Sequence, residues 1–238
     1  MRRFFEDREF ERDVPTELSA QTAHHLVRVL RAQPGDELVL FNGRGGQWHA
    51  RVETVEKKRV SVVPLAFSPE DRTPPVAVTV ALPLIKGERM DVALQKATEL
   101  GAAGFQLLIT ARTEMRLDEQ RLMRKMQHWQ GVVNSACEQC GLNRVPRVSM
   151  PRMAESFLND QRPGLKLIAR AGGEPLRNLD ATGAESAVLL TGPEGGFSDH
   201  ELELAARSGY RAVTLGQRTL RAETAPAAIL AGLWTLLE

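Results

Sequence analysis

The stretch that decides the fold is Leu189-Leu190-Thr191-Gly192-Pro193-Glu194-Gly195-Gly196-Phe197-Ser198. Residues 187–191 form an apolar run that is typical of a strand buried on both faces. The glycines that follow let backbone amides approach a ligand closely, and Ser198-Asp199-His200-Glu201 is a capping box that opens a helix. This order predicts an α/β domain with a ligand beyond the carboxyl end of the strand. A plain tight turn is the alternative, because glycine is common in turns.

A second loop follows one unit later. It reads Thr214-Leu215-Gly216-Gln217-Arg218-Thr219-Leu220-Arg221-Ala222-Glu223-Thr224-Ala225 and leads into a helix that begins near Pro226, since proline is favoured at the first helical position. Exposed arginine and glutamate between two buried elements are more often functional than structural. The first loop lacks the lysine of a phosphate-binding loop, and the chain has no G-x-G-x-x-G.

Outward from these loops, predicted strands and helices alternate. Apolar runs predict strands at 76–82, 105–110, 165–169, 187–191 and 212–215. Helical spacing of apolar residues predicts helices at 89–100, from Asp118 to Gly141, at 198–208 and from Pro226 onward. Strands separated by helices favour a mostly parallel sheet that is covered on both faces.

The N-terminal part has a different character. Residues 67–75 contain three prolines and read as a linker, because proline disfavours helix interiors and central strands. Before it, strands are predicted at 37–41, 47–55 and 59–65, and a helix at 22–31. A glycine-rich turn, residues 42–46, joins the first two strands. These pieces favour a small β-barrel-like domain with one helix.

Composition limits the class of protein. The chain has 238 residues, a net charge of +1 and 42% hydrophobic residues, which is ordinary for a globular protein. No stretch approaches the roughly 20 apolar residues of a membrane helix, the N-terminus lacks a signal peptide's apolar core, and two cysteines exclude a disulfide scaffold. We therefore expect a cytoplasmic protein. Residues 111–152 are rich in arginine and predict either a basic patch or a solvated helix face.

Cys137 and Cys140 form a C-x-x-C pair. A zinc site needs a second pair or histidines at matching spacing, and none occurs. His24 and His25 point about 100° apart on a helix and make a poor metal pair. We expect reduced thiols and no metal.

Several motifs together resemble one known family. Gly192–Ser198, Leu215-Gly216 and Leu220–Ala225 are similar to the ribosomal RNA small subunit methyltransferase E family, which comprises uracil-N3 enzymes of the SPOUT superfamily. The matching motifs elsewhere are Arg2-Arg3-Phe4-Phe5, His24-His25-Leu26, Val29-Leu30-Arg31, Lys96-Ala97-Thr98-Glu99-Leu100-Gly101, Trp129, Ala136-Cys137-Glu138-Gln139-Cys140-Gly141 and Asn143-Arg144-Val145-Pro146. The resemblance covers nearly the whole chain, with one departure at Leu142, where an arginine or similar polar residue is expected.

The resemblance implies a fold and a reaction. It implies a PUA-like RNA-binding domain over residues 1–70 and an α/β knotted (SPOUT, trefoil-knot) methyltransferase domain over residues 74–238. It implies S-adenosylmethionine as the methyl donor and 16S ribosomal RNA of the small subunit as the substrate. It also implies a homodimer through the C-terminal helix, whose apolar residues cover nearly all sides of it.

The same resemblance implies the site residues. The donor is expected against three loops that contain Ala169, Thr191, Gly192, Glu194, Gly195, Gly196, Leu215, Gly216, Leu220 and Arg221. We expect Arg221 to stabilise an anionic uracil, and Glu223 or Glu138 to help accept the proton. The candidates for RNA contacts are Arg2, Arg3, Arg28, Arg31 and Arg144. The alternatives are a helix-dipole charge for Glu223 and surface ion pairs for the N-terminal arginines.

Two other functions remain open from the sequence. One is a non-catalytic RNA-binding protein that assists ribosome assembly, which would not need residues 192–197 intact. The other is a small-molecule α/β enzyme with a nucleotide ligand, which would not need the N-terminal domain.

Overall fold

The computed structural model describes residues 1–113 and 118–237 and divides into two compact units. The first unit contains Met1–Thr73 and Cys137–Val145, and the second contains Pro74–Ala136 and Pro146–Glu238. Residues 137–145 thus group with the N-terminal unit, although they lie inside the range 74–238. Glu114 and Arg116 of the charged stretch lie outside the described residues.

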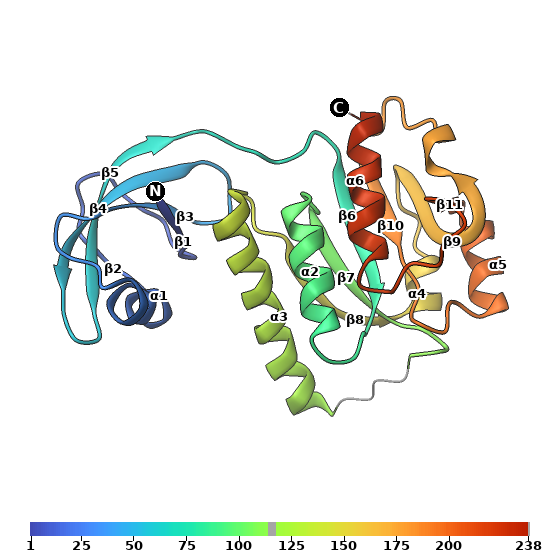
Figure 1. Cartoon of the computed structure of the whole chain (residues 1–238), viewed down its shortest axis with the longest axis horizontal. Helices are drawn as coiled ribbons and strands as arrows, with labels where there is room; N and C mark the ends of the chain where they lie inside the picture. Colours follow the sequence, from blue (N-terminus) through green and yellow to red (C-terminus); the bar gives the residue numbers. More distant parts are fainter. Residues whose placement is uncertain (114–117, 238) are drawn as a thin grey trace. The chain divides into compact units, whose positions relative to one another are not determined.

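The second unit is built on a six-stranded parallel sheet (Figure 1). Its order is β11 (Arg211–Thr214), β9 (Leu165–Pro175), β10 (Ser186–Leu190), β6 (Ala77–Pro83), β7 (Gly104–Ile109) and β8 (Arg147–Met153). All its pairings are parallel, which confirms the predicted sheet. The edge strand β8 was missed, because its polar residues and Pro151 argue against a strand, although proline is tolerated at an edge.

Helices cover both faces of this sheet. They are α2 (Arg89–Glu99), α3 (Glu119–Cys140), α4 (Ala154–Leu158), α5 (Asp199–Arg207) and α6 (Ala225–Leu237). Figure 1 shows α2 and α6 side by side, and the Trp234 indole of α6 donates to the Leu100 carbonyl at 2.5 Å. On the other face α4 contacts α5, and both pack into a core with alternate strand residues such as Val188 and Leu190. Among the described residues, no helix is long and apolar enough to span a membrane.

The predicted helix starts of the second unit are confirmed. The Ser198 hydroxyl accepts a hydrogen bond from the Glu201 amide at 3.2 Å, and the Glu201 carboxylate accepts one from the Ser198 amide at 2.8 Å. The Asp118 carboxylate accepts from the Arg121 amide at 2.8 Å. The capping box therefore fixes how the glycine-rich loop enters α5.

The first unit contains a five-stranded sheet. Its order is β1 (Arg2–Phe5), β3 (Glu37–Phe41), β4 (Gln47–Val55), β5 (Val60–Ser68) and β2 (Thr16–Glu17). The three predicted strands are confirmed, although β5 continues to Ser68 and shortens the linker. The strands β1 and β2 were missed because they are short and polar at one end.

The helix of the first unit differs from the prediction of one regular helix at 22–31. It begins as α1 (Ala20–His24), where the Ser19 hydroxyl accepts from the Thr22 amide, and continues as the π-helix η1 (His25–Leu30). The C-cap residue Arg31 has a φ of 51°. A single-residue register change of this kind leaves no periodic signal that distinguishes it from an α-helix.

Candidate functional site

The glycine-rich loop, residues 192–196, follows the carboxyl end of β10. The Thr191 amide donates to the Ala81 carbonyl at 2.9 Å, which anchors the loop to β6. The Gly196 amide donates to the Pro193 carbonyl at 2.8 Å, and Gly196 has a φ of 71°. A Cβ atom on Gly192 would lie 3.1 Å from the Phe197 ring. The loop is therefore a tight turn, and its ligand-binding role stays a prediction.

Two buried oxygens near these loops lack hydrogen-bond partners among the described residues. They are Thr191 Oγ1, on a fully buried residue, and Glu223 Oε2, on a side chain that is 12% exposed. Buried polar atoms are nearly always paired, and an unpaired one costs about 1–3 kcal/mol. Thr191 Oγ1 and Glu223 Oε2 are therefore candidate contacts for a polar ligand.

The loop after β11 exposes two apolar side chains. Leu215 is 41% exposed and Leu220 is 36% exposed, although both are large apolar residues. Gly216 has a φ of 130°, and a Cβ atom there would meet nothing within 4 Å. The Arg221 side chain is 79% exposed and lies 3.9 Å from the Glu223 carboxylate. The loop thus combines open space, apolar side chains and two exposed arginines, Arg218 and Arg221.

The third predicted segment begins at Ala169 in β9. The register of β9 against β11 jumps from Ile168 opposite Ala212 to Glu174 opposite Val213. Residues 169–173 therefore lie outside the regular pairing, in a bulge beside the second loop. Ala169 itself is half-buried at the start of this bulge.

These features fit S-adenosylmethionine. Its sulfonium and amino groups are cationic, and the buried Glu223 carboxylate offers the matching negative charge. The Thr191 hydroxyl can pair with a polar group of the donor, and the exposed leucines can cover its adenine ring.

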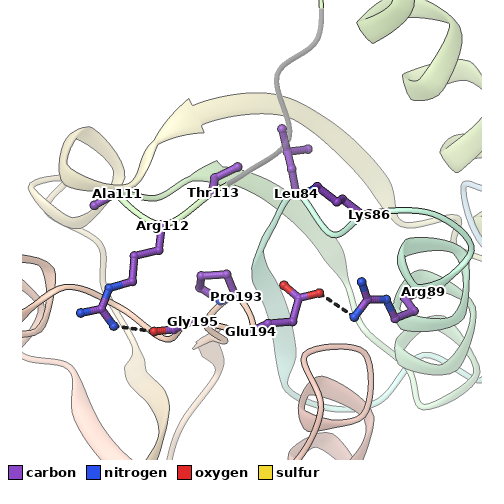
Figure 2. A pocket seen from close by; sticks show the side chains of 9 residues that line it. All are labelled: Leu84, Lys86, Arg89, Ala111, Arg112, Thr113, Pro193, Glu194 and Gly195. Atoms are coloured by element: carbon purple, nitrogen blue, oxygen red, sulfur yellow. Dashed lines mark hydrogen bonds and ion pairs between the residues drawn. The ribbon is translucent and has the colours of Figure 1, made fainter.

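A cavity of about 540 Å³ opens beside the glycine-rich loop (Figure 2). Its lining residues are Leu84, Lys86, Arg89, Ala111, Arg112, Thr113, Pro193, Glu194 and Gly195. Figure 2 shows Arg112 reaching the Gly195 carbonyl, which accepts its hydrogen bond, and Arg89 facing Glu194. The Arg89 and Glu194 side chains form an ion pair at 2.7 Å. The sequence interpretation did not single out Lys86, Arg89 or Arg112 as site residues.

The Glu201 side chain, which caps α5, also contacts a backbone segment that lines this cavity. Its carboxylate is 2% exposed and accepts a hydrogen bond from the Ala111 amide at 2.8 Å. The same side chain caps α5, so it links the segment that carries Arg112 to the glycine-rich loop. The capping motif is visible in the sequence, but this second contact joins residues 90 positions apart and leaves no local signal.

Six predicted site residues belong to the first unit, and two of them, Arg3 and Glu138, are partly buried. The Arg3 guanidinium is half-buried and donates to the side-chain oxygens of Gln47 and Asn143. Burial lowers the pKa of this guanidinium. The Glu138 carboxylate accepts from the Phe5 amide at 2.9 Å, and burial raises its pKa. The structure therefore gives Arg3 and Glu138 contacts inside the fold.

The remaining arginines of the first unit are exposed. Arg144 donates to the Asp71 carboxylate at 2.8 Å and keeps a 58% exposed side chain. Arg2, Arg28 and Arg31 are exposed and form no ion pair in the described part of the chain. The surface ion pairs considered as an alternative are thus absent for these three arginines.

The cysteines and Leu142 lie inside the first unit. Cys137 is a buried thiol whose pKa is raised by burial, and Cys140 is half-buried. Leu142 is 6% exposed, so the residue that departs from the family pattern packs as an apolar side chain. Within residues 1–113 and 118–237, no cluster of three potential ligands could hold a metal ion.

Comparison with known proteins matches both parts of the chain. An RNA methyltransferase domain matches residues 72–234, and an RNA methyltransferase PUA domain matches residues 18–65. Ribosomal RNA small subunit methyltransferase E from Synechocystis is 35% identical, over 93% of this chain and 73% of the relative. The enzyme of that name from Bacillus subtilis is 30% identical, over 90% and 88%.

Solved structures show the same fold. A methyltransferase from Legionella pneumophila with bound S-adenosylmethionine superposes with a TM-score of 0.94 and 35% identity, over 98% of this chain and 97% of that one. Ribosomal RNA small subunit methyltransferase E from Neisseria gonorrhoeae, also bound to S-adenosylmethionine, gives 0.92 and 34%, over 99% and 98%. With both domains matched in order, this chain belongs to the ribosomal RNA small subunit methyltransferase E family.

Proposed function

We propose that the protein transfers a methyl group from S-adenosylmethionine to N3 of one uridine in 16S ribosomal RNA. The observation that carries this proposal is the pair of buried, unpartnered oxygens on Thr191 and Glu223 beside two glycine-containing loops. A non-catalytic RNA-binding protein would have no use for these atoms, which cost stability when no ligand is bound.

The donor would be held by the three loops described above. Thr191, Glu223 and the backbone of residues 192–196 supply polar contacts, while Leu215 and Leu220 cover its apolar ring. Gly216 leaves the room that a side chain would occupy. When bound, S-adenosylmethionine supplies an electrophilic methyl carbon on a positively charged sulfur. The protein's task is then to hold the acceptor nitrogen in line, which accounts for at most about 7–11 kcal/mol of the barrier.

The acceptor chemistry requires removal of a proton from the imide nitrogen of uracil. Arg221 is exposed and can stabilise the negative charge that develops on the base. Glu223 is the better supported of the two proposed proton acceptors, because it shares a loop with Arg221. Glu138 remains the second candidate, and its raised pKa suits proton uptake nearer neutral pH.

The first unit would bind the RNA. Arg2, Arg28, Arg31 and Arg144 present exposed guanidinium groups that suit phosphate oxygens. Arg3 would act indirectly, because its guanidinium already holds Gln47 and Asn143 in place.

Three further properties complete the proposal. The protein would act in the cytoplasm and pair with a second copy through α6, where Leu236 is 39% exposed. An apolar side chain exposed on so apolar a helix supports a protein contact there. The trefoil knot that the resemblance implies remains a prediction.

The test is methyl transfer from labelled S-adenosylmethionine to small ribosomal subunits from a strain that lacks this protein. We expect 3-methyluridine in the digested 16S RNA, identified by mass spectrometry. Arg221→Ala should lose about 100-fold in rate, whereas Arg218→Ala, an exposed arginine of the same loop, should keep it. Donor binding without transfer would reopen the substrate, and full turnover by Arg221→Ala would remove its assigned role.

A further inference from the structure

The cavity beside Arg112 has the size and charge of a nucleotide site. Its volume of about 540 Å³ lies within the range of small-molecule pockets. Three of its lining residues are cationic, Lys86, Arg89 and Arg112, and one is anionic, Glu194. Glu194 pairs with Arg89 at 2.7 Å, and Arg112 presents its guanidinium to the cavity. An anionic or electron-rich ligand is therefore favoured.

The cavity shares one wall with the proposed donor site. Glu194 and Gly195 line it, and both belong to the loop that would bound the donor. None of the residues that line it is Ala169, Gly216 or Leu220, so the cavity is distinct from the rest of the donor's lining. Methyl transfer needs donor and acceptor atoms about 3–3.5 Å apart. An acceptor site must therefore adjoin the donor site, as this cavity does.

Arg112 is held in the cavity from two sides. The Ala111 amide donates to the buried Glu201 carboxylate at 2.8 Å, which fixes the backbone. The Arg112 guanidinium donates to the Gly195 carbonyl (Figure 2). A guanidinium has five N–H donors, and in the described part of the chain this is its one hydrogen bond. The other donors are available to a ligand.

We propose that this cavity receives the target uridine after it leaves its base stack, and that Arg112 contacts the uracil. The proposal rests on the proposed function and names the acceptor site for it. Enzymes that modify a base in structured nucleic acid extrude it into a pocket. Lys86 is placed to assist with the nucleotide's charge, and Glu201 is a positioning residue that acts through the Arg112 segment.

The transfer step balances with this assignment. The N3 proton passes to the carboxylate proposed as base, and the negative charge spreads to the two uracil carbonyl oxygens. The Arg112 guanidinium stabilises that charge. The bond from N3 to the methyl carbon forms as the bond from that carbon to sulfur breaks, and sulfur keeps the electron pair. The products are 3-methyluridine and S-adenosylhomocysteine.

The experiment compares Arg112→Ala, Arg112→Lys and Arg112→Gln in the full-length protein. Arg207→Ala, an exposed arginine on α5, is the matched control. Donor affinity is measured by titration calorimetry, and transfer to small subunits by single-turnover assay at saturating donor. Thermal unfolding of each variant checks that it folds.

We expect Arg112→Ala to bind the donor as the wild type does and to transfer about 100-fold more slowly. Lysine, which keeps the charge, should restore more activity than glutamine, which keeps only a donor to Gly195. A weakened donor affinity would show that the cavity belongs to the donor, and an unchanged rate would show that it is unused; either overturns the proposal. Wild-type protein that binds donor but transfers nothing would instead overturn the proposed function.

Discussion

The polar groups around Arg3 in the first unit and those around Thr191 and Glu223 in the second are both buried, but they are used differently. The terminal nitrogens of Arg3 donate to Gln47 and Asn143, and the Asn143 amide donates to a backbone carbonyl. Thr191 Oγ1 and Glu223 Oε2 have no hydrogen-bond partner among the described residues, and at Arg3 only Nε lacks one. The terminal nitrogens of Arg3 thus hold neighbouring side chains in place, whereas the oxygens of Thr191 and Glu223 are the ones proposed to contact the donor.

This difference distinguishes polar groups that stabilise the fold from polar groups that are proposed to bind a ligand. A buried group whose partners lie in the same chain should affect stability when it is removed, and leave ligand binding unchanged. Removal of a buried group without partners should not lower stability, but it should weaken ligand binding.

The largest effect is expected at Asn143. It is 1% exposed, and its removal leaves the half-buried Arg3 guanidinium without one acceptor. Asn143→Ala should lower the free energy of unfolding by about 2–3 kcal/mol, measured by urea denaturation, with no change in donor affinity. Asn159→Ala, at an exposed position in the second unit, should cost almost nothing. Equal losses in the two variants would contradict a structural role for the cluster.

Thr191→Val should have the opposite pattern. It replaces an unpartnered buried hydroxyl by a methyl group, so the free energy of unfolding of the ligand-free protein should rise by about 1 kcal/mol. Donor affinity should fall by about tenfold as one hydrogen bond is lost. Calorimetry and urea denaturation measure the two quantities.

Thr98→Val is the matched control for this prediction. Thr98 is equally buried, but its hydroxyl donates to the Leu94 carbonyl at 2.7 Å. Its replacement should therefore lower stability by about 1 kcal/mol and leave donor affinity unchanged. Stability changes of the same sign in both variants would contradict the proposed ligand-binding role of the Thr191 hydroxyl.

The smallest effect is expected at Glu138 and depends on pH. Burial raises the pKa of this carboxyl above its ordinary value of 4.5, so the folded state binds the proton more tightly than the unfolded state. Stability therefore falls as pH rises from 4.5 through the folded-state pKa. Glu138→Gln removes this dependence, so it should stabilise the protein above that window and not below it. A constant difference at all pH values would contradict the raised pKa.

Much of the second unit's fold could be predicted from the sequence, because the signals for its strands and helices are local. The buried strand, the glycines and the capping box lie within residues 187–201, and the structure confirms each of them. Strand β8 and the π-helix were missed because edge strands and register changes lack a distinctive periodicity.

The site was harder to predict than the fold, because a sequence shows that an arginine is present but not where its guanidinium points. Arg3 was expected to contact the RNA, whereas its guanidinium is half-buried and donates to Gln47 and Asn143. Arg112 was counted only within the arginine-rich stretch 111–152, yet it lines the cavity and contacts Gly195, 83 residues away. Such long-range pairings depend on the sheet order, which residue spacing does not encode.

The central proposal is that the Glu223 carboxylate, whose Oε2 has no hydrogen-bond partner among the described residues, binds the cationic donor. Titration calorimetry of S-adenosylmethionine into the wild-type protein and Glu223→Gln tests it most directly. The account predicts binding by the wild type and at least about tenfold weaker binding by the variant, because a charge-assisted contact is lost. Equal affinity of the two proteins, or no binding to the wild type, would contradict it.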